Sequence, residues 1–375
     1  PVAEYLAALQ REIEVTTNHI ARPLRVNHVH FGGGTPTIIT PMQFAQLIEL
    51  LRQKFTLLPD TDVAVEIDPR TLTREMALEL GASGITRASL GVQSFDPVVQ
   101  QAINRFQSFE DTATATERLL AAGVRNINFD LIYGLPHQTV ASCFDTVRKC
   151  LKLRPDRLSV FGYAHVPTFK KHQRKIDEAA LPDGANRHLQ ANMIACSLTA
   201  AGYRQIGLDH FALPKDSLVT AQSMGNLHRN FQGYTTDTND VLIGFGASAI
   251  GRLNQGYVQN DVVPRSYCAQ IGRGDLATKK GYALTAEDRL RADIIERIMC
   301  DFRVDLQQVC TKHETTLATV LQLATRLNSL AADGVIDLQG SLLSVADEAR
   351  HLVRSVASAF DAYIGASGPV YSRTV

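Results

Sequence analysis

The stretch HFGGGTPT, from His30 to Thr37, follows a short apolar run and decides how the chain is read. Three consecutive glycines carry no Cβ, so the backbone can take positive φ and bring bare N–H and C=O groups against a ligand. The next residues, Thr40 to Gln43, are typical of a helix start, with a capping box and proline at the first helical position. The glycines therefore lie between a strand and a helix, where α/β sheets and barrels bind ligands. The alternative is a tight connection that only lets strand and helix pack, because short motifs match by chance.

Strand and helix patterns alternate along the first half of the chain. The predicted strands are 29–31, 63–67, 87–92, 126–133 and 158–163, and the predicted helices are 3–15, 43–54, 74–80, 108–122, 140–153 and 187–201. Repeated βα units favour parallel strands with helices outside. Five strands are fewer than the eight of a full barrel. We therefore predict an α/β fold, a partial TIM-like (β/α)6 barrel over 1–208, with its first strand upstream of Pro1.

Two further segments follow the predicted barrel. Residues 209–280 are irregular, glycine-rich and polar, which is typical of loops that cover a site. Residues 281–375 contain a capped helix after Thr285, a helix over 315–332, a hairpin in VIDLQGSLLSV and a last helix to Tyr363. This order predicts a small winged-helix-like, mainly helical domain. Such domains often bind DNA, but the basic residues here are scattered and the acidic ones numerous, so we expect no nucleic-acid partner.

Composition is that of an ordinary soluble globular protein. The 375 residues are 45% hydrophobic and 20% charged, and 38 Lys and Arg balance 38 Asp and Glu. This balance gives no net charge that would attract the protein to nucleic acid or a membrane. No apolar run approaches the roughly 20 residues that span a bilayer. The six cysteines form no CxxC or CxxxCxxC spacing, so we interpret most as reduced, small hydrophobic residues of a cytoplasmic protein without a metal site in this stretch.

Several polar residues fall at the carboxyl ends of predicted strands. Because these ends share one mouth in a barrel, we expect Glu66, Gln93, Asp130 and Ala164 to face the glycine loop. Any one of them could instead be a structural cap or ion-pair partner. Arg105 is either a solvated helix residue or a bidentate ligand for a carboxylate.

Three polar clusters lie farther along the chain. FKKHQRK, 169–175, is either a solvated face or a site for a polyanionic small molecule. DHFALP (209–214) and HRNFQGYTT (228–236) are predicted to be dense polar loops, which a packed core would not tolerate unpaired.

Together these motifs resemble a known family. HFGGGTPT, EIDPR, LGVQSF, NINFDLIYGLP, DRLSVFGYAHVP, DHFALP, LHRNFQGYTT and GFGASAIG occur in the order found in the oxygen-independent coproporphyrinogen III oxidases. These are radical S-adenosylmethionine (SAM) enzymes of haem biosynthesis, and the resemblance covers essentially the whole chain. HRNFQGYTT and DHFALP are specific to this oxidase type, whereas the glycine run occurs across the superfamily.

The resemblance implies a reaction. A four-iron–four-sulfur (4Fe-4S) cluster would cleave S-adenosylmethionine, and the resulting 5′-deoxyadenosyl radical would take a hydrogen from a propionate β-carbon of coproporphyrinogen III. Two propionates would become vinyl groups, giving protoporphyrinogen IX. The family also implies two S-adenosylmethionine molecules, an electron-donor protein as partner, and a monomer.

The resemblance also assigns residues, of which none is catalytic in the narrow sense. The first S-adenosylmethionine would contact Gly33, Gly34, Thr35, Glu66, Ala164 and Ile250. A second would contact Gly34, Thr35, Gln93, Arg105 and Asp130. Arg229 with Lys170, Lys171 and Lys175 would bind the substrate's propionates.

One family feature is not in this sequence. The family's CxxxCxxC triad, which binds the iron–sulfur cluster, would lie upstream of Pro1, so we expect these 375 residues alone to be inactive. Two other functions stay open: a haem-binding, chaperone-like relative of the same superfamily, and a barrel without a cluster that acts as a binding module.

Overall fold

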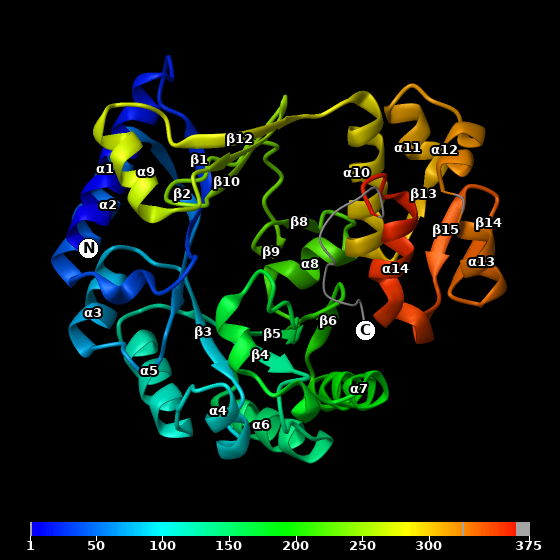
Figure 1. Cartoon of the computed structure of the whole chain (residues 1–375), viewed down its shortest axis with the longest axis horizontal. Coiled ribbons are helices and arrows are strands. Elements are labelled where there is room, and N and C mark those ends of the chain that lie inside the picture. The colour runs from blue at the N-terminus through cyan, green and yellow to red at the C-terminus, as the bar shows by residue number, and fades with distance from the viewer. Residues whose placement is uncertain (1, 325, 365–375) are drawn as a thin grey trace. The chain divides into compact units, whose positions relative to one another are not determined.

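The computed structural model of the chain describes residues 2–324 and 326–364, and its central element is a mixed seven-stranded sheet (Figure 1). The strand order is β1-β2-β3-β4-β5-β7-β6. The strands are β1 Arg25–Phe31, β2 Thr56–Ile67, β3 Arg87–Gln93, β4 Asn126–Tyr133, β5 Arg157–Gly162, β6 Arg204–Ile206 and β7 His210–Ala212. The chain divides into two compact units, and the boundary between them runs through β3 and β4. Each unit is described by itself.

Parallel pairing organises the first unit, which comprises 1–91, 110–128 and 237–284. β1 pairs parallel with β2, with Phe31 opposite Val65, and β2 pairs parallel with β3, with Ile67 opposite Leu90. Because parallel strands point the same way, the carboxyl ends of β1 and β2 lie at one edge of the sheet. β3 alternates buried and half-buried residues, as expected for a strand with one face in a packed core.

Helices between these strands pack on the sheet. They are α1 Val2–Asn18, α2 Pro41–Lys54, α3 Arg74–Ala82 and α5 Phe109–Ala121. The predicted capping box is present at α2: Gln43 N donates to Thr40 Oγ1 at 3.3 Å, and Thr40 N donates to Gln43 Oε1 at 2.9 Å. Helices α1 and α2 share an apolar cluster formed by Leu6, Ile13, Leu47, Leu51 and Phe55. Burial of these faces holds both helices in place.

A second, three-stranded antiparallel sheet completes the first unit. It contains β10 Ile250–Leu253, β11 Gly256–Asn260 and β12 Thr278–Ala283, and α9 Pro264–Gly272 lies between β11 and β12. Helix α9 packs against α1, where the rings of Tyr5 and Tyr267 are 5.5 Å apart (Figure 1).

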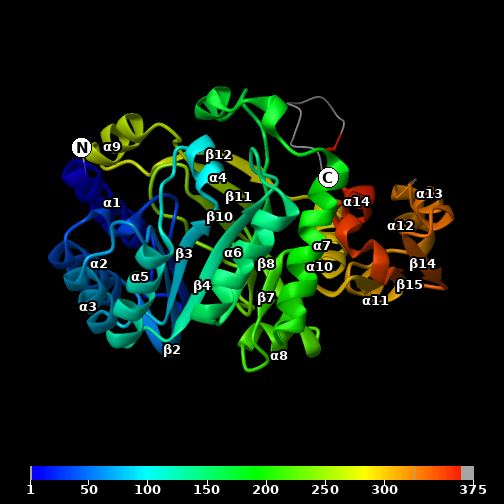
Figure 2. The same cartoon turned by 90° about the horizontal axis from the view of Figure 1, so that it is seen from below.

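The second unit, 92–109, 129–236 and 285–375, carries the other end of the sheet. Here β5 pairs antiparallel with β7, and β7 pairs antiparallel with β6, so this edge is a hairpin and not a further βα unit. Its helices are α4 Pro97–Ala102, α6 Val140–Leu153, α7 Gly184–Ala200 and α8 Ser217–Ser223, and Figure 2 shows α6 and α7 side by side. A two-stranded hairpin, β8 His228–Asn230 and β9 Gly233–Thr235, follows.

The carboxyl-terminal part of this unit has the predicted winged-helix-like order. Its elements are α10 Ala286–Asp301, β13 Arg303–Asp305, α11 Leu306–Lys312, α12 Leu317–Leu323, α13 Leu327–Ala332, β14 Ile336–Gln339, β15 Leu342–Val345 and α14 Val353–Ala357. The predicted hairpin is β14–β15, and β13 adds a third strand to it. Thr285 and Asp288 form the predicted capping box of α10. These elements enclose a core of their own around Ile298, Leu306 and Leu343.

The α/β fold class predicted from the sequence is confirmed, with three corrections of detail. The segment after about 205 is not irregular loop, because it contains β6 to β12 together with α8 and α9. DHFALP is likewise not a loop, since His210–Ala212 is a buried strand of the main sheet. The helix predicted over 315–332 is two helices, α12 and α13, with Ala324 between them, while residue 325 lies outside the described residues. The domain boundaries 1–208, 209–280 and 281–375 stay a prediction.

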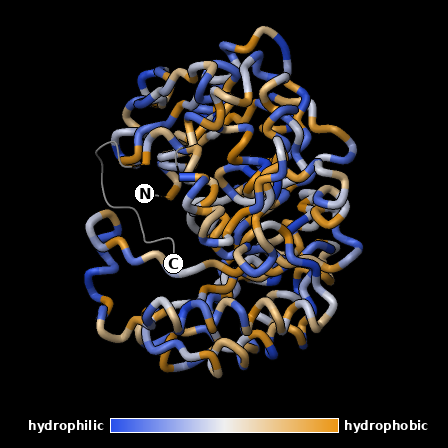
Figure 3. Tube along the Cα trace, turned by 90° about the vertical axis from the view of Figure 1, so that its right-hand side faces the viewer, coloured by the Kyte–Doolittle hydropathy of each residue, from blue (hydrophilic) through white to orange (hydrophobic). Residues whose placement is uncertain are grey.

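Hydrophobic and hydrophilic residues are intermixed along the described part of the trace (Figure 3). Within 2–324 and 326–364, no helix is both long and apolar enough to span a bilayer.

A buried ion pair in the second unit gives a test of the packing. Arg157 Nε and Nη2 each donate to Asp216 at 2.6 Å, and both residues are buried. We expect Arg157→Met to lower the free energy of unfolding by about 3–5 kcal/mol, because Asp216 is left as an uncompensated buried charge. The matched control is Arg148→Met, which breaks the exposed Arg148–Asp145 pair and should cost less than about 1 kcal/mol. Urea unfolding measures both, and equal losses would contradict this interpretation.

Candidate functional site

The glycine loop leaves β1 and meets the end of β2. Gly33 has φ +81° and Gly34 has φ +153°, and a Cβ on either would meet no atom within 4 Å. Gly33 N donates to Glu66 Oε2 at 3.2 Å, so the predicted neighbours Gly33 and Glu66 do lie together. Thr35 precedes the short 3₁₀ helix Pro36–Ile38, and its carbonyl accepts from Ile38 N at 3.0 Å. The loop therefore presents bare main chain to open space beside a carboxylate.

His30 lies near the carboxyl end of β1 and supports this arrangement. Its Nε2 lies 3.2 Å from Glu66 Oε1, and a Cβ on Gly32 would come within 2.8 Å of the same nitrogen and 2.7 Å of Glu66 Oε1. A Cβ on Gly32 would therefore displace the ends of these two side chains, whereas Gly33 and Gly34 face open space. The close packing at Gly32 agrees with the tight-connection explanation, and ligand binding by the glycine run stays a prediction.

Ile250 begins β10 and follows a tightly held loop of the same unit. Buried Glu12 on α1 accepts from Gly246 N at 2.7 Å, Asn260 Nδ2 at 2.6 Å and Tyr267 Oη at 2.8 Å. Burial raises the pKa of the Glu12 carboxyl despite these three donors. Helix α1 therefore fixes the GFGASAIG loop and, through it, the start of β10.

In the second unit, Gln93 is the last residue of β3 and has φ +64°. A non-glycine residue in this region of the backbone map costs on the order of 1 kcal/mol or more, and such strain clusters at functional sites. Arg105 follows α4, and its Nη2 donates to Gln107 Oε1 at 3.2 Å. Asp130 is half-buried in β4. The shared role of these three side chains stays a prediction.

Ala164 and the lysine cluster meet through a residue that the sequence analysis did not single out. Buried Gln173 donates from Nε2 to Ala164 O at 2.9 Å and accepts from Val166 N at 2.6 Å. It lies in the 3₁₀ helix Lys171–Lys175. Lys170, Lys171 and Lys175 are exposed around it. The available signal was an amide side chain within a run of basic residues.

Asp209 and His210 of DHFALP form a buried polar pair in the second unit, and Tyr234 of HRNFQGYTT packs on the His210 ring. Asp209 Oδ1 lies 2.8 Å from His210 Nδ1, and Asp209 Oδ2 lies 3.3 Å from Arg354 Nη2. Burial alone would raise the pKa of Asp209, but the His210 hydrogen bond and the charges of Arg229 and Arg354 hold it below its usual value. Arg229 lies over the Tyr234 ring at 5.5 Å.

The six cysteines are free thiols. Burial raises the pKa of Cys143 and Cys300 to about 12, so neither is a thiolate at neutral pH. Cys196 is exposed and Cys268 half-buried, unlike the other four. Among the described residues no group of three or more His, Cys, Asp or Glu could hold a metal ion.

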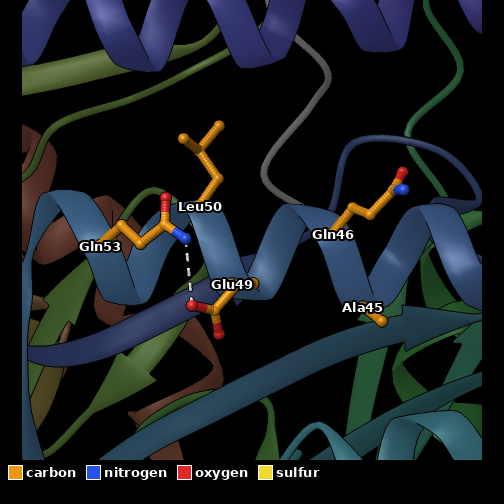
Figure 4. Close-up of a pocket in the computed structure, with 5 residues that line it drawn as sticks. All are labelled: Ala45, Gln46, Glu49, Leu50 and Gln53. Carbon is orange, nitrogen blue, oxygen red and sulfur yellow. Dashed lines mark hydrogen bonds between the residues drawn. The ribbon is translucent and has the colours of Figure 1, made fainter.

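A hollow on the surface of α2 is unrelated to these residues (Figure 4). All five lining residues come from this one helix, and Gln53 Nε2 donates to Glu49 Oε1 at 3.1 Å. It is a groove between turns with one carboxylate, and it carries no chemistry that we can assign.

Comparison with known proteins gives first the class and then the family. Residues 8–150 match the model of the radical SAM superfamily. A solved structure, coproporphyrinogen III oxidase HemN from Escherichia coli, a radical SAM enzyme, has a TM-score of 0.92 and 38% identity and covers 96% of this chain and 83% of its own.

Curated relatives agree with that structure. The oxygen-independent coproporphyrinogen III oxidase of Bradyrhizobium diazoefficiens is 59% identical over 374 residues, which are 100% of this chain and 83% of the relative. The anaerobic coproporphyrinogen III oxidase 1 of Cereibacter sphaeroides is 41% identical over 97% of this chain and 80% of its own length. The chain belongs to the oxygen-independent coproporphyrinogen III oxidase family, as the sequence motifs predicted.

Membership of the radical SAM superfamily implies S-adenosylmethionine and a 4Fe-4S cluster as cofactors. The loop at Gly33 and Gly34 fits the first, because open space faces their main chain where a Cβ would fill it. The described residues do not fit the cluster, since they bring no three cysteines together.

The lowered pKa of Asp209 predicts a pH-dependent loss of stability. Its contribution is present above the ordinary pKa of 3.8 and is lost as the pH falls below that value toward the folded-state pKa. We therefore expect Asp209→Asn to lower the free energy of unfolding by about 1–3 kcal/mol at pH 7, with a smaller difference from wild type below pH 4. Urea unfolding from pH 7 to pH 3 measures it, with the 81% exposed Asp240, changed to Asn, as control. An unchanged stability at pH 7 would refute the ionised role of Asp209.

Proposed function

We propose that the protein is an oxygen-independent coproporphyrinogen III oxidase of porphyrin and haem biosynthesis. It converts two propionate side chains of coproporphyrinogen III to vinyl groups and so yields protoporphyrinogen IX. The observation that carries this proposal is the similarity to such oxidases along 96–100% of the chain, in sequence and in structure. Each conversion removes one hydrogen atom, one CO₂ and one electron, so an electron acceptor is also required.

The bound cofactors supply abstraction of a hydrogen atom from the propionate β-carbon. The chain's own residues bind and orient the reactants. Main-chain groups of Gly33, Gly34 and Thr35 receive the methionine end of S-adenosylmethionine, for which their open main chain is suited. Glu66 accepts from ribose hydroxyls, since a carboxylate offers acceptors only.

The remaining assignments divide between two S-adenosylmethionine molecules. Main-chain edges at Ala164 and Ile250 suit the adenine of the first. The side chains of Gln93, Arg105 and Asp130 contact the second, with Arg105 binding its carboxylate. The strained backbone of Gln93 supports a functional position there.

For the substrate, Arg229 and the exposed Lys170, Lys171 and Lys175 offer positive charge to the propionates. Gln173 anchors the lysine helix to the carbonyl of Ala164, which ties this basic segment to the end of β5. An electron-donor protein and a monomeric state are further parts of the proposal.

Substitution of Gly33 tests the main-chain site. We expect Gly33→Ala to weaken S-adenosylmethionine binding about tenfold, because a methyl at φ +81° is strained and fills the space that the ligand would take. Gly184→Ala is the matched control, since it adds the same methyl into open space without a positive φ. Equilibrium dialysis with the full-length, cluster-loaded protein measures both, and equal affinities would remove Gly33 from the site.

Anaerobic turnover tests the function itself. Full-length protein reconstituted with iron and sulfide should consume coproporphyrinogen III and release protoporphyrinogen IX and 5′-deoxyadenosine. Stoichiometric haem binding without consumption of coproporphyrinogen III would instead identify a haem-delivering relative.

A further inference from the structure

Three arginines from distant parts of the chain gather in the second unit. Arg187 lies on α7, Arg229 on β8 and Arg354 on α14. Two of them, Arg229 and Arg354, act on the buried Asp209, and Arg187 and Arg354 both act on the phenol of Tyr133 at the end of β4. The geometry agrees: Arg354 Nη2 lies 3.3 Å from Asp209 Oδ2, and the Arg187 guanidinium lies 5.9 Å from the centre of the Tyr133 ring.

Among the described residues, the guanidinium of Arg229 forms no ion pair with a carboxylate. Glu296 Oε1 accepts a hydrogen bond from the main-chain N–H of Arg229 at 3.2 Å, and it lies 3.2 Å from His228 Nδ1. Its contact with Arg229 is therefore to the main chain and not to the guanidinium. Among the described residues, the Arg229 guanidinium has no hydrogen-bond partner, and its buried Nε is unsatisfied. It lies over the ring of Tyr234, an arrangement that holds a cation without neutralising it.

Arg187 likewise has hydrogen-bond donors without a partner. Its Nη1 donates to Tyr163 O at 2.9 Å, and its buried Nε has no partner among the described residues. A Cβ on Gly134 would lie 3.0 Å from Arg187 Nη1, and one on Gly162 would lie 3.2 Å from Arg187 Nη2. The two strand ends therefore leave room for this guanidinium because both are glycines.

Arg354 is the accessible member. Its side chain is 47% exposed, and its Nη2 lies 3.3 Å from Asp209 Oδ2. Asp209 is 7% exposed and also bonds His210, so it cannot neutralise all three arginines. The ring of His210 packs edge-on against Phe161, a 36% exposed aromatic side chain of β5. Cations and an accessible apolar ring thus lie around one carboxylate.

We infer that Arg187, Arg229 and Arg354 form a carboxylate-binding site for propionate arms of a tetrapyrrole, with Phe161 beside its apolar ring system. The planar guanidinium fork binds a carboxylate through two parallel hydrogen bonds, and three such groups suit a ligand with several carboxylates. Asp209 holds Arg354 in place before the ligand arrives. This inference rests on the proposed function and adds Arg187 and Arg354 to it.

Binding of coproporphyrin III, the air-stable porphyrin with four propionates, tests the site in the full-length protein. Mesoporphyrin IX, with two propionates on a similar ring, serves as the comparison ligand. We expect wild type to prefer coproporphyrin III, and Arg354→Gln and Arg187→Gln each to weaken its binding about tenfold with a smaller effect on mesoporphyrin IX. Binding should also depend less steeply on salt in the variants.

Two controls separate binding from folding. Arg148→Gln removes an exposed arginine on α6 and should leave the affinity unchanged. Arg187→Lys keeps the positive charge but not the planar guanidinium fork, so it should recover only part of the affinity. Thermal unfolding identifies any variant that has lost its fold. If coproporphyrin III binds to folded Arg354→Gln and Arg187→Lys as it does to wild type, the arginine site is refuted. Absence of binding to wild type would refute the site as well, whereas absence of anaerobic coproporphyrinogen III turnover by wild type would refute the proposed function.

Discussion

The contact between the Gly33 amide and the Glu66 carboxylate is the constraint on which the site depends. It exists because β1 and β2 run parallel and end at one edge of the sheet, and because Gly33 can adopt φ +81°. His30 contacts the same carboxylate, and Gly32 has no Cβ that would crowd it. The result is main chain without Cβ atoms facing open space next to a charged acceptor.

Charge is handled differently in the second unit. His210, Arg229 and Arg354 hold the pKa of buried Asp209 below its usual value despite its desolvation. The buried Nε atoms of Arg187 and Arg229 nevertheless have no hydrogen-bond partner among the described residues. In the first unit Glu12 also lies buried, but three donors satisfy it and its role is to hold a loop. A satisfied buried charge indicates structure, whereas surplus guanidinium groups indicate a ligand.

The sequence predicted those parts of the fold that local chemistry determines. The capping boxes at Thr40 and Thr285 and the strand 126–133 are where the residue patterns placed them. The short strands β6 to β12 were missed, because three to six residues carry too little local pattern and become a strand only through pairing. The glycine loop and Glu66 could be predicted from motifs, but Arg187 and Arg354 lie outside any motif and meet only through the fold.

The most direct test of the account is a structure of the full-length protein with S-adenosylmethionine bound. The account predicts that the ligand contacts the main chain of Gly33 and Gly34 at hydrogen-bonding distance, with its ribose at the Glu66 carboxylate. A ligand bound elsewhere, with side chains filling the space in front of these glycines, would contradict it.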